Sequence, residues 1–189
     1  MTAHTTAAAN WSWELIARAL AGLTALFGAP MPGWISRAAW RRACRELRRM
    51  EALARRLILV MSAQYEPGLP ARRQSSGNRA KRRAVERTGF ALFDPLPAGL
   101  DAPGIMAPPL PEDFATPTHG LARRMAALAD LMAAPEAAAL RMARWLARPV
   151  GTRTTPICLT RLSGPLAEPL SDALALFQRL AVERLNAPP

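Results

Sequence analysis

The sequence predicts an all-α protein, a small bundle of about four helices with a long, largely disordered, basic and Pro-rich central tether. Apolar residues recur every three or four positions in several separate stretches, which is the period of an amphipathic helix. Nine of the 18 prolines fall within residues 67–117, a density that a packed core seldom tolerates. We therefore expect an N-terminal helical pair over residues 10–65, a tether over 66–117, and a helical region over 118–186 that packs on the pair.

The first helix is expected to begin at Asn10 or Ser12, since both residue types are good N-caps, and to end at the glycine and prolines that follow Phe27. The segment before it is expected to be disordered and lacks the basic region of a signal peptide. The helix is apolar except for a narrow polar stripe that contains Glu14 and Arg18. Those charges and the prolines argue against a membrane span, so we expect a core or interfacial helix.

The second helix has the strongest amphipathic pattern. Ser36 is its expected N-cap, and the helix continues to about Gln64. A seam of matching length runs through residues 121–146, so the two seams should pack on each other, in antiparallel orientation. The seam of the second helix consists of Trp40, Ala43, Leu47, Met50, Ala54, Leu57 and Met61.

The C-terminal part continues the helical pattern. Residues 118–148 keep the spacing, with a break expected just before Pro135. One β-like run, residues 152–162, contains a proline that restricts it to a sheet edge or a loop. A last amphipathic helix is expected after Pro169 or Ser171.

A small hydrophobic patch, formed by Phe90, Leu92 and Phe93, interrupts the tether. It could dock on the helical core as an extended segment, or it could anchor a partner. Docking is the favoured interpretation.

Residues that could carry chemistry are few. His119, Cys158 and Asp130 could be drawn as a nucleophile triad, but no local motif brings them together. The other cysteine, Cys44, neighbours the seam of the second helix and is expected to be packed. No metal-ligand spacing and no glycine-rich phosphate loop occurs in the sequence. We therefore expect a protein that is not an enzyme and that has no cofactor, no metal and no small-molecule substrate.

The net charge of the chain lies in one block. Residues 37–87 contain 15 Arg or Lys and four acids, whereas the rest of the chain is balanced at ten of each. Self-repulsion in such a block is relieved by an anionic partner, and arginine binds phosphate with two hydrogen bonds at once. The expected anion-binding residues are Arg41, Arg45, Arg48, Arg49, Arg72, Arg73, Arg79, Lys81, Arg82 and Arg83.

The partner of this block remains open between two phosphate-bearing surfaces. Nucleic acid is slightly favoured over an anionic membrane because the helix and the tether together offer many phosphate contacts. In the alternative, the protein is peripheral to a membrane or anchored in it, held by the helix over residues 11–27. A solvated helix face with a charged linker is the non-functional interpretation. Self-association through apolar helix faces is a further option for the partner. The two cysteines do not form a disulfide framework, which favours a cytoplasmic protein.

The stretches RRMEALARRLILVM, FALFDP and AAALRMARWLAR resemble a group of uncharacterised Ala/Arg-rich bacterial proteins. The resemblance implies the order helix, tether with a Phe-rich patch, helix. It implies no activity.

Overall fold

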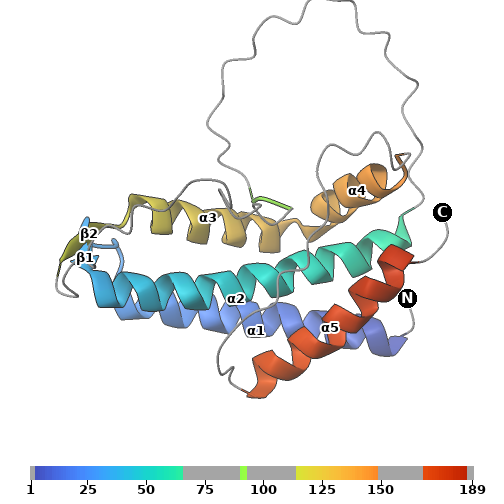
Figure 1. Ribbon diagram of the computed structural model, residues 1–189, viewed down its shortest axis with the longest axis horizontal. Helices are drawn as coiled ribbons and strands as arrows, with labels where there is room; N and C mark the ends of the chain where they lie inside the picture. Colours follow the sequence, from blue (N-terminus) through green and yellow to red (C-terminus); the bar gives the residue numbers. More distant parts are fainter. Residues whose placement is uncertain (1–2, 66–89, 93–113, 149–167, 187–189) are drawn as a thin grey trace, which may run out of the picture.

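The computed structural model describes residues 3–65, 90–92, 114–148 and 168–186 (Figure 1). Within these ranges the fold is mostly helical, as the sequence predicts, with five α-helices and one two-stranded sheet. Residues 66–89 and 93–113 of the predicted tether, and the β-like run 152–162, lie outside the described residues. The proposed division into three segments therefore stays a prediction. The elements are α1 (Ala3–Phe27), β1 (Trp34–Ser36), α2 (Arg37–Met61), the 3-10 turn η1 (Ser62–Gln64), β2 (Ala115–Pro117), α3 (His119–Ala133), α4 (Pro135–Leu146) and α5 (Glu168–Asn186).

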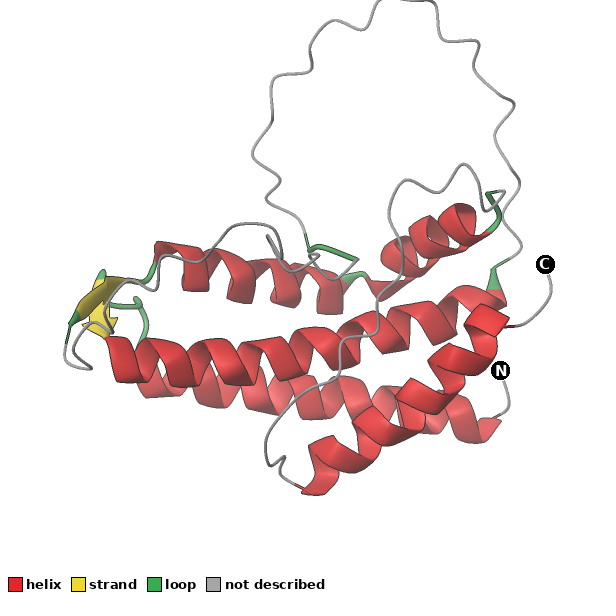
Figure 2. Ribbon diagram, viewed as in Figure 1, coloured by secondary structure: helices red, strands yellow, loops and turns green. Residues whose placement is uncertain are grey.

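Helix α2 is the centre of the bundle. It contacts α1, α3, α4 and α5, and Figure 2 shows it lying between α3 and α4 on one side and α1 and α5 on the other. Ser36 caps it as expected: the Ala39 N–H donates to the Ser36 Oγ at 3.3 Å. The apolar run Leu57–Val60 is buried on all sides, because neighbouring helices cover this half of α2 completely.

The first helix begins earlier than the sequence predicts, at Ala3 rather than at Asn10 or Ser12. Alanine is the strongest helix former, and the Ala-rich segment before Asn10 extends the helix. Ser12 does not act as a cap: it is buried, and its Oγ donates to the Ala8 carbonyl at 2.8 Å. The expected disorder of the described residues before Asn10 is therefore wrong.

The two seams run parallel, and the antiparallel expectation is wrong. Strands β1 and β2 pair with each other, and each strand leads directly into a helix. The Arg37 N–H donates to the Phe114 carbonyl at 3.0 Å, and the Thr118 N–H donates to the Gly33 carbonyl at 3.1 Å. Helices α2 and α3 therefore start at the same end of the molecule and run in the same direction (Figure 1).

The C-terminal half follows the predicted pattern. Helix α3 ends at Ala133, and Pro135 opens α4, as a proline at the first helical position should. Helix α5 begins at Glu168, close to the predicted start, and its fully buried Phe177 lies in the same core as Leu57 of α2.

Two buried charged side chains of α2 form hydrogen bonds to other helices. Glu51, only 8 % exposed, accepts two hydrogen bonds from Arg124 of α3, at 2.9 and 3.0 Å, and a longer one from Arg55 at 3.5 Å. One turn further on, buried Arg56 donates to the side-chain oxygen of Gln178 in α5 at 2.7 Å. Since an unpaired buried charge is costly, these bonds fix where α3 and α5 can lie along α2.

The segment Phe90–Leu92 lies against α2. Phe90 and Leu92 are partly buried against the core, and the Arg55 Nε donates to the Ala91 carbonyl at 3.0 Å. The Arg55 guanidinium also lies over the Phe90 ring, 5.3 Å from its centroid, a cation–π contact. The third member of the patch, Phe93, lies outside the described residues.

Replacing Glu51 by Ala leaves Arg124 without its carboxylate. We expect the free energy of unfolding in urea, followed by far-UV circular dichroism, to fall by about 2–3 kcal/mol. The matched control is Glu14→Ala, which removes an exposed pair with Arg18 and should cost about 0.5 kcal/mol or less. Equal effects of the two substitutions would contradict a structural role for the buried pair.

Replacing Phe90 by Ala removes the ring from beneath Arg55. We expect a loss of about 1 kcal/mol of stability in the same urea titration, from lost apolar contact and the cation–π interaction. Ala91→Ser, which changes an exposed side chain next to it, is the control. An unchanged stability in Phe90→Ala would mean that Phe90 does not dock on the bundle.

Candidate anion-binding surface

The N-terminal half of α2 carries a row of arginines that we call the basic face: Arg41, Arg42, Arg45 and Arg48. Residues spaced three and four apart lie on one side of a helix. Arg42, Arg45 and Arg48 are exposed and Arg41 is partly exposed. Among the described residues, no carboxylate forms an ion pair with any of the four, so their positive charge is available to a ligand.

Neighbouring arginines of α2 have structural partners instead. Arg49 pairs with Glu46 at 2.8 Å. Arg55 and Arg56 are engaged further along the helix by the contacts described above. In the described residues, Arg41, Arg42, Arg45 and Arg48 thus lack a carboxylate partner, whereas Arg49, Arg55 and Arg56, which follow them along α2, are bonded.

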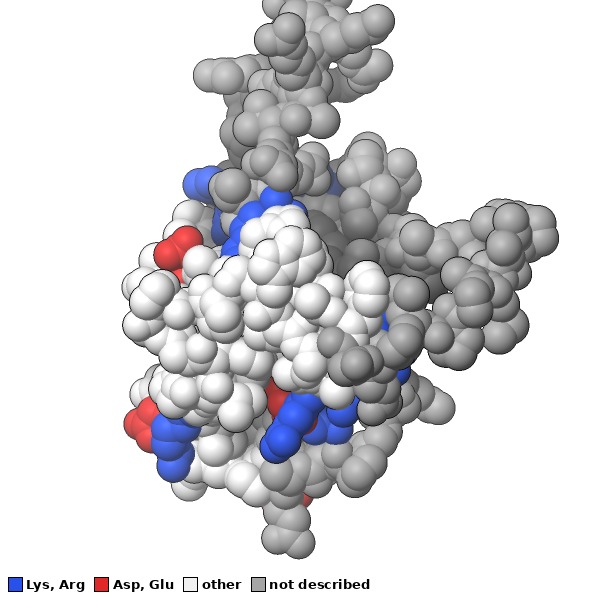
Figure 3. Space-filling view, turned by 90° about the vertical axis from the view of Figure 1, so that its left-hand side faces the viewer, with Lys and Arg blue, Asp and Glu red and all other residues white. Residues whose placement is uncertain are grey.

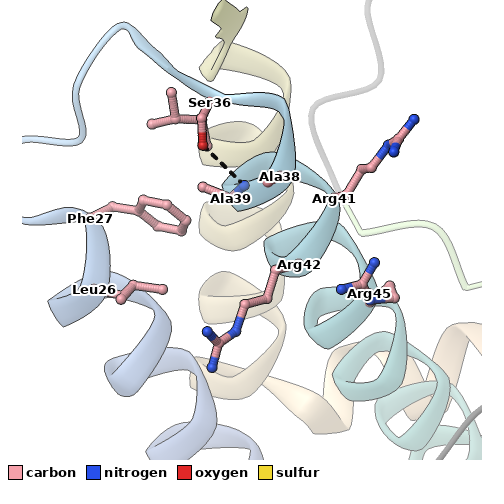
Figure 4. Close-up of a pocket in the computed structure, with 9 residues that line it drawn as sticks. Leu26, Phe27, Ser36, Ala38, Ala39, Arg41, Arg42 and Arg45 are labelled. Carbon is pink, nitrogen blue, oxygen red and sulfur yellow. Dashed lines mark hydrogen bonds between the residues drawn. The ribbon is translucent and has the colours of Figure 1, made fainter. Parts of the chain in front are cut away.

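An open depression lies beside the basic face, between the end of α1 and the start of α2. Its apolar part is formed by Leu26 and Phe27 of α1 together with Ile35 of β1 and the first alanines of α2. Arg41, Arg42 and Arg45 also line it, and Figure 4 shows the Arg42 side chain extending toward Leu26. The site therefore combines an apolar surface with guanidinium groups, a combination suited to an anion that has an apolar portion.

The structure places the predicted anion-binding residues in two groups. Arg41, Arg45, Arg48 and Arg49 share the N-terminal half of α2, with Arg49 already paired. The other predicted residues, namely Arg72, Arg73, Arg79, Lys81, Arg82 and Arg83, lie outside the described residues.

Sequence reasoning missed Arg42 and the apolar residues beside it. Arg42 could have been found from its spacing, because it precedes Arg45 by three residues. Leu26 and Ile35 could not, because nothing local distinguishes an apolar side chain that stays at the surface from one in the core.

No other cluster with catalytic potential is found in the described part of the chain. His119 and Asp130 are both exposed, 11 residues apart on α3, and Cys158 lies outside the described residues. The described ranges contain no group of three His, Cys, Asp or Glu side chains that could hold a metal ion.

Cys44 is a buried thiol on α2. Burial raises its pKa above the ordinary value, although the nearby charges of Arg124 and Arg48 act in the opposite direction. Arg124 also donates to the Cys44 Sγ, at 3.9 Å. Because the thiolate is the reactive form, this cysteine is a weak nucleophile at neutral pH.

None of the helices in the described ranges is long and apolar enough to cross a membrane. No family model, curated protein or solved structure matches this chain. The function therefore has to be argued from the surface itself.

The Cys44 thiol should react slowly with Ellman's reagent. In a Cys158→Ser variant at about pH 8, the raised pKa leaves little thiolate, and burial blocks access, so we expect a rate at least about tenfold below that of the same chain unfolded in urea. Equal rates in the folded and unfolded states would contradict the packing of Cys44 in the core.

Proposed function

We propose that this protein is a nonenzymatic binding protein that engages a phosphate-bearing polyanion through the basic face of α2. The observation that carries the proposal is that Arg41, Arg42, Arg45 and Arg48 adjoin one another on one helix side and are not neutralised by carboxylates in the described residues. Guanidinium groups in a row match the repeated phosphates of a polymer or a lipid surface.

The bonded arginines of α2 support the same reading. Where an arginine serves the fold, as Arg56 and Arg124 do, it meets a polar partner on another helix at 2.7–3.0 Å. Within the described ranges, the basic face makes no such contact. The start of α2 adds the positive end of the helix dipole to the same region.

Nucleic acid and anionic lipid share the phosphate group, and this proposal rests on that shared chemistry. The same basic block continues into the tether, for example at Arg72 and Arg82. These residues would add phosphate contacts and make the binding constant more dependent on salt concentration. The absence of a catalytic constellation from the sequence favours binding over catalysis.

Replacing Arg41, Arg45 and Arg48 together by Gln should remove three phosphate contacts. For a duplex DNA oligonucleotide titrated between about 50 and 200 mM salt, the slope of log Kobs against log salt should become shallower by about 2.7. Anionic vesicles tested in parallel should also lose affinity, since each basic residue near such a surface adds about 1 kcal/mol.

The matched control replaces Arg141, Arg144 and Arg179 by Gln, three exposed arginines of α4 and α5. It removes the same net charge from other helices and should change the slope by less than about 1. Identical behaviour of the two triple variants would overturn the assignment to α2. Binding of neither probe by the unmodified protein would overturn the proposal as a whole.

A further inference from the structure

The end of the bundle that holds the sheet exposes three large apolar side chains. Leu26 at the end of α1 is 60 % exposed, Trp34 of β1 is 64 % exposed, and Phe114 next to β2 is 50 % exposed. Partly buried Phe27, Met31 and Ile35 lie in the same segments. Soluble proteins seldom leave large apolar side chains gathered at one place without a function.

The fold brings these three residues to one end of the bundle although they are distant in sequence. Trp34 pairs with Pro117 across the sheet, and the Phe114 carbonyl accepts the hydrogen bond from the first residue of α2. Leu26 lines the depression together with Ile35 and Ser36, so it lies beside the same strand. We call Leu26, Trp34 and Phe114 the apolar end.

The described residues of the apolar end carry no charge and border the basic face, and Glu112 and Asp113 directly precede Phe114 in the sequence. No charged residue occurs between Arg18 and Arg37, and Leu26 shares one depression with Arg42 and Arg45. In the described helices that meet here, the first carboxylates are Glu14, Glu46 and Asp130, each at least two helical turns from the sheet. Figure 3 views this end directly and shows an uncharged surface with both basic and acidic side chains around it.

We infer that the apolar end docks on the surface of an anionic phospholipid bilayer, with Leu26, Trp34 and Phe114 entering the interface and the basic face contacting lipid phosphates. This inference rests on the proposed function and names its partner. Aromatic side chains favour the headgroup region of a bilayer, and arginines beside them bind phosphate while their stems cover apolar surface.

A lipid surface fits the composition of the site better than nucleic acid does. A platform for bases stacks them on aromatic faces, whereas Leu26 is aliphatic and the uncharged loop that follows it offers proline and methionine. The basic face also adjoins the apolar end, because Leu26 lines the same depression as Arg42 and Arg45. The sequence had favoured nucleic acid slightly, and the exposed apolar end reverses that preference.

The test uses the full chain and vesicle flotation. Vesicles of phosphatidylcholine with about 30 mol % phosphatidylglycerol should bind the protein, and each arginine of the basic face should add about fivefold in affinity over phosphatidylcholine alone. Replacing Leu26, Trp34 and Phe114 together by Ala should weaken binding to the anionic vesicles by about 10- to 100-fold. Binding to duplex and single-stranded DNA should stay within about twofold, because no arginine is changed.

Two further variants control for the fold and for apolarity in general. Trp11→Ala with Val182→Ala removes exposed apolar side chains, 42 % and 40 % exposed, that lie outside the apolar end, and should leave vesicle binding unchanged. Leu26→Ser alone, in the last turn of α1, keeps the sheet intact and should still lose affinity severalfold. Far-UV circular dichroism of each variant checks that the helices are retained.

The outcomes separate this inference from the proposed function. Binding to DNA with no binding to anionic vesicles, or vesicle binding unaffected by the triple substitution, overturns the inference and leaves the basic face intact as a polyanion site. Loss of single-stranded DNA binding in the triple variant overturns it in favour of base stacking. Concentration-dependent dimerisation that the triple variant abolishes assigns the apolar end to a second copy of this chain and also overturns it.

Discussion

The structure depends on one constraint, which is that α2 must be covered on all sides along its C-terminal half. Its run Leu57–Val60 has no polar side, so helices α1, α4 and α5 all have to reach it. The N-terminal half of α2 is amphipathic in the ordinary way, and its polar side stays open. Neighbouring helices therefore bury the C-terminal half of α2 and leave one side of its N-terminal half exposed to solvent. The basic face lies on this exposed side.

The buried polar contacts stand at the transition between these halves. Glu51 is the last acidic residue of α2, and it joins α2 to α3 through two hydrogen bonds from Arg124. Arg56 joins α2 to α5 through Gln178. Apolar packing alone tolerates the sliding of one helix along another by one turn. A buried charged group does not tolerate it, because the shift would separate the group from its hydrogen-bond partner. These two contacts therefore give the bundle its register.

A very small sheet determines the architecture at the N-terminal end of α2. Three residue pairs join β1 to β2, and each strand continues into a helix, so the starts of α2 and α3 are held side by side. Parallel neighbours place both helix N-termini, with their partial positive charge, at the same end as the arginines of α2. The same pairing brings Trp34 and Phe114 to the end of the molecule where Leu26 already lies. The apolar and the basic parts of the candidate site thus come from one local arrangement.

The sequence by itself determined the fold class, the cap at Ser36, the break before Pro135 and the concentration of basic residues in 37–87, because helical period, capping and charge are local properties. It placed the start of α1 too late, since two plausible N-caps were given more weight than the helix propensity of the alanines before them. The tertiary structure alone decided that α2 and α3 run parallel and that Trp34 and Phe114 lie at the same end of the bundle. Both facts follow from hydrogen bonds between residues 33–37 and 114–118, two segments too short to show a strand pattern and too distant in sequence for any local rule to join them.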